Sequence, residues 1–98
     1  MIKTDSTQAG IVAALKAAGA SVEMITSATG RKGIPDLLVG FRGRNYLIEC
    51  KAVKGKRNPR PADLSDGQAR WHEAWQGAKP WVCMTPEGAL VAIGVVAP

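Results

Sequence analysis

Residues 33–52 have the sequence GIPDLLVGFRGRNYLIECKA. This stretch predicts two apolar strands, Ile34–Phe41 and Tyr46–Val53, because Arg42-Gly43-Arg44-Asn45 between them carries a turn signal. Successive residues of a strand point to opposite faces, so Glu49 and Lys51 share one face and stand roughly 6.5 Å apart. Charged groups therefore interrupt an apolar hairpin.

Asp36 can join that face in either of two hairpin registers. With Gly43-Arg44 as a two-residue loop, Asp36 lies opposite Lys51 and diagonal to Glu49. With residues 41–44 as the loop, Asp36 lies opposite Glu49. Opposite neighbours are about 5 Å apart and diagonal ones about 7–8 Å. In both registers, two carboxylates and an ammonium group meet on one face.

Such charges are costly inside apolar strands unless they pair with each other or bind a cation. One interpretation is a structural ion pair that joins Lys51 to Glu49 or Asp36. The other is a metal site, since Mg²⁺ commonly takes one or two carboxylates together with phosphate oxygens. A metal would polarise a phosphodiester and lower the pKa of a bound water. Lys51 would then orient that water or stabilise charge on the phosphate.

The dipeptide Pro35-Asp36, followed by Glu49-Cys50-Lys51, resembles the PD-(D/E)XK nuclease motif. The wider pattern GIPDLLVG, RNYLIECKA and LSDGQARWHEAW resembles the VRR-NUC branch, including its small stand-alone phage and bacterial members. This resemblance extends over most of the chain. It implies an α/β fold with a restriction-endonuclease-like αβββαβ core, in which two helices flank a mixed sheet. It also implies DNA cleavage that depends on Mg²⁺ or Mn²⁺.

The resemblance also implies roles for single residues of the chain. By position they are the metal ligands Asp36 and Glu49, the catalytic lysine Lys51 and a further motif residue, Gln68. The backbone carbonyl of Cys50 is often a ligand in such nucleases. Related nucleases often carry a glutamate near the start of the first helix, where Asp5 stands here. Asp5 is thus a possible supporting acid, although a helix cap at this position needs no other role.

Length and composition predict one small globular domain, residues 1–98. Lys and Arg exceed Asp and Glu by 13 to 8, which gives a net charge of +5 and suits a polyanionic partner such as DNA. Solubility alone would also explain this charge. No membrane span or signal peptide is visible. Cys50 and Cys83 lie in apolar runs and are expected to be buried free thiols, which favours a reducing cytoplasm. The resemblance to phage and bacterial proteins implies that this is the cytoplasm of a bacterial or phage-infected cell.

Two basic segments flank the hairpin and are candidate contacts to the DNA backbone. The first, residues 28–33, carries Arg31 and Lys32 between glycines. The second, residues 54–61, has no apolar residue besides its prolines and carries Lys54, Lys56, Arg57 and Arg60. For the first segment, an ordinary charged connecting loop is an equal alternative.

The other elements follow from caps and apolar periodicity. The first helix is expected from about Asp5 to Ala18, and the first strand over Ser21–Ser27. A second helix should begin after a cap at Ser65 or Asp66 and end near Gln76. Two final strands are expected, Trp81–Met84 and Ala89–Val95, with a turn at residues 85–88.

The second helix carries the remaining candidate residues. Gln68 lies in its first turn, where an amide could hold a water or a phosphate oxygen, although a surface glutamine is the alternative. Trp71 and Trp75 stand one turn apart and, with Trp81, are candidate anchors of a homodimer or parts of the core. His72 is the only histidine and has no partner in the sequence, so we expect it at the surface or behind the site.

Together these patterns predict a metal-dependent DNA endonuclease, selective for junction, flap or nicked DNA and working as a homodimer. One alternative is a non-catalytic basic DNA-binding module with an inert Asp36, Glu49 and Lys51 cluster. Another is a small interaction protein whose tryptophans form an interface.

Overall fold

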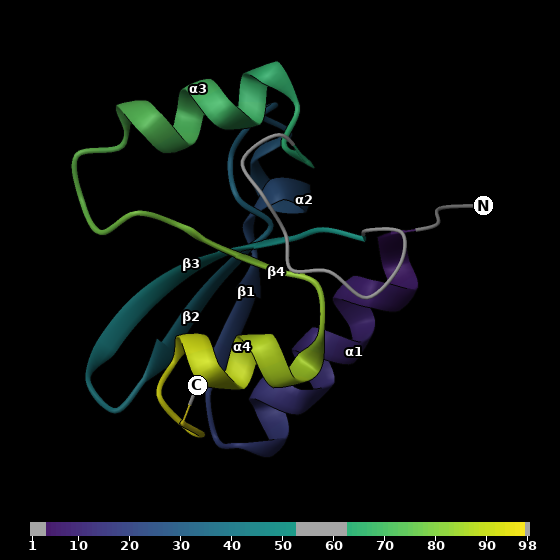
Figure 1. Ribbon diagram of the computed structural model, residues 1–98, viewed down its shortest axis with the longest axis vertical. Helices are drawn as coiled ribbons and strands as arrows, with labels where there is room; N and C mark the ends of the chain where they lie inside the picture. The colour runs from purple at the N-terminus through teal and green to yellow at the C-terminus, as the bar shows by residue number, and fades with distance from the viewer. Residues whose placement is uncertain (1–3, 53–62, 98) are drawn as a thin grey trace.

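The computed structural model describes residues 4–52 and 63–97. Its elements, in chain order, are α1 (Thr4–Ala17), β1 (Ser21–Met24), α2 (Ile25–Thr29), β2 (Leu37–Phe41), β3 (Arg44–Cys50), α3 (Asp66–Ala74), β4 (Trp81–Cys83) and α4 (Pro86–Ala92) (Figure 1). The expected αβββαβ order is present. Two further helices add to it: α2 follows β1, and α4 follows β4.

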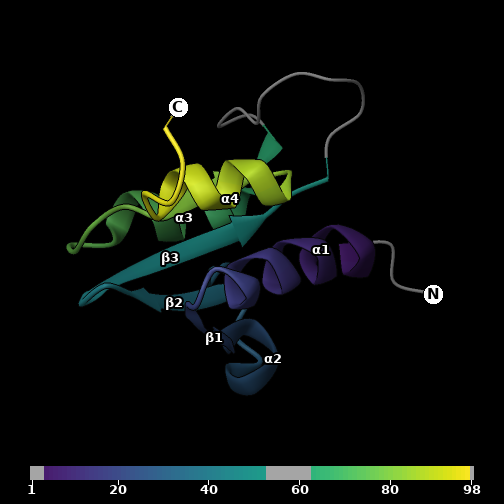
Figure 2. The same ribbon diagram turned by 90° about the horizontal axis from the view of Figure 1, so that it is seen from below.

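The four strands form one mixed sheet in the order β1-β2-β3-β4. β1 and β2, and β2 and β3, pair antiparallel, whereas β4 pairs parallel with β3. A parallel neighbour needs a crossover connection, and the chain between β3 and β4 includes α3. The predicted mixed sheet is confirmed. Figure 2 shows α2 beyond the β1 edge of this sheet.

A two-residue turn sets the register of the β2–β3 hairpin. Phe41 pairs with Arg44, and the turn residues Arg42 and Gly43 both have positive φ, at 51° and 79°. Positive φ at both positions matches the twist of the flanking strands. The observed turn therefore has two residues, whereas residues 42–45 were predicted. Both strands are also shorter than predicted. Leu37 pairs with Ile48, so the same register places Asp36 opposite Glu49, as in the second of the two predicted registers.

Helices α1 and α4 contact each other and close the hydrophobic core on one face of the sheet. They contribute Ile11 and Leu15 from α1 and Ala89, Ala92 and Ile93 from α4. The sheet contributes Leu37, Val39, Ile48, Cys50 and Cys83. Both cysteines are buried free thiols, as predicted. Because Ile48 and Cys50 point into this core, Glu49 between them points to the opposite face.

The first strand was predicted too long. It ends at Met24, and the chain then forms the short helix α2. The Ile25 amide donates to the backbone oxygen of Asp36 at 2.9 Å, and Thr26 Oγ1 donates to the Pro35 oxygen at 2.9 Å. These bonds fasten α2 to the residues that precede β2, so the predicted strand residues 25–27 support the Asp36 turn instead of extending the sheet.

The predicted last strand, Ala89–Val95, is wrong, because this segment belongs largely to helix α4. Thr85 caps the helix by accepting the Gly88 amide at 3.0 Å, and Pro86 occupies its first turn. Ala89, Ala92 and Ile93 are buried with the i, i+3, i+4 spacing of a helix. The residues predicted as a turn therefore begin a helix that packs on α1.

Helix α3 begins where predicted and ends about two residues early. Ser65, one of the two expected caps, accepts the backbone N–H of Gln68 at 3.2 Å with its side-chain oxygen. At the other end, Lys79 Nζ donates to three carbonyl oxygens, those of His72, Glu73 and Trp75. This ammonium completes the helix terminus, where carbonyls lack internal partners. Trp71 and Trp75 stack with their ring centroids 4.6 Å apart.

α3 lies apart from α1 and α4 (Figure 1), and none of its residues is fully buried. One close backbone approach helps to place it. Gly33, at φ 87°, lies so near α3 that a Cβ there would stand 2.7 Å from the Gly67 oxygen. This contact also brings the Arg31-Lys32 turn beside the first turn of α3.

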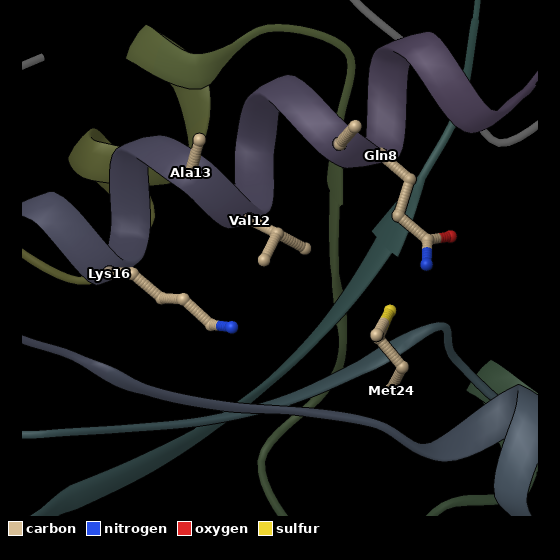
Figure 3. Close-up of a pocket in the computed structure, with 6 residues that line it drawn as sticks. Gln8, Val12, Ala13, Lys16 and Met24 are labelled. Atoms are coloured by element: carbon tan, nitrogen blue, oxygen red, sulfur yellow. The ribbon is translucent and has the colours of Figure 1, made fainter.

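Between α1 and β1 lies a hollow of about 470 Å³, to which Gln8, Val12, Lys16 and Met24 contribute (Figure 3). Its lining carries no carboxylate, and it lies on the α1 face of the sheet, opposite Glu49. This hollow is therefore not the candidate active site. No helix of the described part is long and apolar enough to cross a membrane.

The Gly33 contact predicts a difference between two glycine substitutions. Gly30→Ala and Gly33→Ala both place a side chain at positive φ, which costs about 1–2 kcal/mol. Only Gly33→Ala also drives a Cβ against the Gly67 carbonyl, so it should lose roughly 1–3 kcal/mol more of the free energy of unfolding. Urea denaturation measures both losses. Equal losses would show that α3 does not depend on this approach.

Candidate active site

Glu49 is a buried carboxylate on the face of the sheet away from the main core, with only 2% of its surface exposed. Its Oε2 accepts a hydrogen bond from Gln68 Nε2 at 2.9 Å. Its Oε1 is buried and has no hydrogen-bond partner among the described residues. A buried carboxylate oxygen that lacks a partner is costly. This oxygen is therefore a candidate ligand of a bound cation.

Asp36 stands beside it in a fixed orientation. Its Oδ2 accepts the Cys50 amide at 2.8 Å, and its backbone oxygen accepts the Ile25 amide. The hairpin register and these two bonds hold the Asp36 carboxylate next to that of Glu49. Two neighbouring carboxylates repel each other unless a proton or a cation lies between them.

Burial first, then the negative charge of Asp36 and the hydrogen bond that a protonated Glu49 makes with the Asp36 carboxyl, together raise the pKa of Glu49 from 4.5 to about 8. The charge of Lys51 opposes this shift. Burial also raises the pKa of the Cys50 thiol well above its usual range, so this thiol stays protonated. Without a cation, the Glu49 carboxyl therefore keeps its proton at neutral pH.

The Gln68 amide joins Lys51 to Glu49. Lys51 Nζ donates to Gln68 Oε1 at 2.9 Å, while Gln68 Nε2 donates to Glu49. Gln68 Oε1 also accepts the Ser65 amide at 2.9 Å, which completes a capping box at the start of α3. The cap therefore fixes the glutamine rotamer that the site uses. A purely structural cluster was expected to pair Lys51 directly with a carboxylate. Within the described part, the Gln68 side chain instead bridges Lys51 and Glu49.

The structure thus brings together four predicted side chains, those of Asp36, Glu49, Lys51 and Gln68. Arg31 and Lys32 are exposed at the same end, on the turn that touches α3. Asp5 lies in the first turn of α1, but its side chain falls outside the described residues. So does the second basic segment with Lys54, Lys56, Arg57 and Arg60. The metal-ligand and catalytic roles of the four assembled side chains, and of the Cys50 carbonyl, stay predictions.

Sequence reasoning gave too little weight to His72. This residue follows Gln68 by one helical turn and is partly buried. Its Nε2 is buried and has no hydrogen-bond partner among the described residues. Burial lowers the pKa of His72, and the positive charge of Lys51 lowers it further. The i, i+4 spacing from Gln68 was the available signal in the sequence.

The donor set fits a hard divalent cation. In the described ranges, no group of three or more His, Cys, Asp or Glu side chains could hold a metal ion. A cation here would therefore take the two carboxylates of Asp36 and Glu49 and complete its shell with a backbone carbonyl, water or phosphate oxygens. Mg²⁺ is commonly bound in this way. The unpartnered Glu49 Oε1 supplies the observation that favours such an ion.

A solved structure titled "VRR_NUC domain" superposes on this fold with a TM-score of 0.67 and 26% sequence identity. The match covers 98% of this chain and 100% of that chain. The chain has the VRR_NUC fold. This finding confirms the resemblance noted from the motifs, and the fold implies the PD-(D/E)XK nuclease family. No protein-family model and no curated protein matches the sequence.

The electrostatics of this VRR_NUC fold predict a pH-dependent effect of Glu49→Gln. Below about pH 4.5 Glu49 is protonated in both folded and unfolded chains, so its ionisation has no effect on stability. As the pH rises to about 8, only the unfolded chain releases the proton, and the folded state is destabilised by an amount on the order of a few kcal/mol. Glutamine escapes this loss and still offers an oxygen to Gln68.

The measurement is chemical denaturation of wild type and Glu49→Gln in EDTA, at about pH 5 and about pH 9. The variant should gain stability over wild type mainly at the higher pH. A stability difference that does not change with pH would mean that the Glu49 carboxyl titrates normally.

Proposed function

We propose that the chain is a Mg²⁺- or Mn²⁺-dependent DNA endonuclease of one domain, selective for junction, flap or nicked DNA. The observation that carries this proposal is the buried, unpartnered Glu49 Oε1 beside the Asp36 carboxylate. A direct ion pair with Lys51 would instead give this oxygen an N–H partner, and among the described residues it has none. The VRR_NUC fold supports the same reaction class.

Each residue has a task in this proposal. Asp36 and Glu49 hold the cation, together with the backbone carbonyl of Cys50. When bound, the ion supplies positive charge to the scissile phosphate and lowers the pKa of a water. Lys51 donates hydrogen bonds to the attacking water or to the charge that develops on the phosphate. Gln68 keeps Lys51 directed at the site and orients Glu49.

Cleavage should disappear in each of three variants: Asp36→Asn, Glu49→Gln and Lys51→Ala. Losing a ligand or a charge-stabilising group usually costs orders of magnitude in rate. The assay is a panel of labelled duplex, nicked, flap and four-way-junction DNA with Mg²⁺ or Mn²⁺, with EDTA as the metal control. Circular dichroism checks that each variant folds. Near-normal cleavage by a folded Glu49→Gln variant would falsify the assignment.

The main alternative is a non-catalytic, basic DNA-binding module. The net charge of +5 is its support. The same panel separates the two functions. A binding module would shift the mobility of junction or flap DNA in a native gel but would not cut it at any metal concentration.

We also propose that the segment with Lys54, Lys56, Arg57 and Arg60 contacts the DNA backbone and not the bases. Neutralising all four should weaken binding to every sequence alike and flatten the salt dependence by roughly one unit of slope per lost phosphate contact. Binding is measured across a salt series in EDTA. Lys16→Gln, on the α1 face of the sheet, is the charge control. An unchanged slope would assign the four cations to solubility.

The working unit is proposed to be a homodimer, because cutting both strands takes two active sites. A two-fold assembly would match the symmetry of a junction. Trp75 and Trp81 are 42% and 48% exposed and remain available as interface anchors. Light scattering at micromolar concentration should give about twice the chain mass of 10.3 kDa. A monomeric mass that DNA does not change would contradict the dimer.

A further inference from the structure

A second side chain of α3 lies near Lys51. His72 follows Gln68 by four residues, so both project from the same face of the helix. Gln68 contacts Lys51 directly, and His72 lies close enough for the Lys51 charge to act on its ring. The imidazole also packs edge-on against Trp71, with 6.3 Å between the ring centroids. The imidazole therefore projects from the face of α3 on which Gln68 meets Lys51, the lysine that the proposed reaction uses.

The hydrogen-bonding capacities of the two residues are complementary. An ammonium group has three N–H donors. Lys51 directs one of them to Gln68 Oε1 among the described residues. His72 Nε2 is buried and has no partner in the same part of the chain. Buried polar atoms are nearly always hydrogen-bonded, so an unpaired one needs an explanation. Lys51 can supply the missing donor.

The ring is suited to accept this donor. Burial and then the Lys51 charge lower the pKa of His72, so the imidazole is neutral at neutral pH. A neutral imidazole that carries its proton on Nδ1 leaves a lone pair on Nε2. Lys79, a second cation of the described part, binds the backbone oxygen of His72 and not its ring.

We propose that His72 is a positioning residue for Lys51: its Nε2 accepts a second N–H of the ammonium that Gln68 already holds. Two acceptors, one helical turn apart on α3, then fix the direction of the ammonium. Its third N–H is left for the water or phosphate at the site. Because Nε2 is buried, this atom is not exposed to DNA. This inference rests on the proposed nuclease function for its consequence, but the contact itself can be tested without cleavage.

The chain contains one histidine, so NMR observes its ring without an assignment problem. The ring ¹⁵N shifts of wild type at about pH 8 should show the proton on Nδ1 and a hydrogen-bonded Nε2. Lys51→Met removes the donor, so the Nε2 signal should move toward that of a free acceptor and the pKa of His72 should rise. A proton on Nε2 in wild type, or ring signals that Lys51→Met does not change, would overturn the contact.

The second test compares two substitutions in single-turnover cleavage. His72→Phe keeps a ring but offers no acceptor, whereas His72→Gln offers an amide oxygen. His72→Phe should slow cleavage about 10- to 100-fold, the range that one hydrogen bond to a charged group supports. DNA affinity, measured in EDTA, should be unchanged. His72→Gln should recover part of the lost rate, and Glu73→Gln is the control on the exposed side of α3.

Equal rate losses in the phenylalanine and glutamine variants, or wild-type rates in both, would contradict the positioning role. A wild-type protein that cuts no DNA would instead refute the proposed nuclease function. In that case the NMR experiment still decides whether Lys51 and His72 are paired.

Discussion

The burial of the Glu49 carboxylate, which has no direct counter-ion among the described residues, is the constraint on which this structure depends. The strand alternation that turns Ile48 and Cys50 into the core forces Glu49 to the opposite face, and the hairpin register sets Asp36 beside it. Among the described residues, Lys51 is joined to Glu49 through the Gln68 amide and not by a direct contact. A divalent cation would relieve this repulsion, since a bound cation favours the charged form of its ligands.

The hairpin and its charged face could be predicted because they follow from strand periodicity and a turn signal. Alternation alone placed Glu49 and Lys51 together, and either register brought Asp36 to them. The turn itself was harder to predict, because Arg42 adopts a positive φ that residues other than glycine seldom take. Gln68 followed from the family motif, whereas its second task, in the Ser65 capping box, was visible only in the structure.

Other features depend on contacts between distant segments. Residues 89–95 are apolar and β-branched enough to suggest a strand, but packing against α1 favours the helix that Thr85 caps. The first strand ends at Met24, and in the helix that follows Thr26 Oγ1 donates to the backbone oxygens of Ile34 and Pro35, which are distant in the sequence. His72 has no partner within its own segment, and its neighbour Lys51 lies on another element. Tertiary packing determines these features, and local sequence patterns do not encode it.

The central claim is that Asp36 and Glu49 together hold a divalent cation. Its most direct test is a crystal structure of the protein grown with Mn²⁺, in which anomalous scattering locates the metal independently of any assumed site. An anomalous peak is expected between the two carboxylates, in contact with Glu49 Oε1. No peak there at saturating Mn²⁺, or a peak only at surface residues elsewhere, would contradict it.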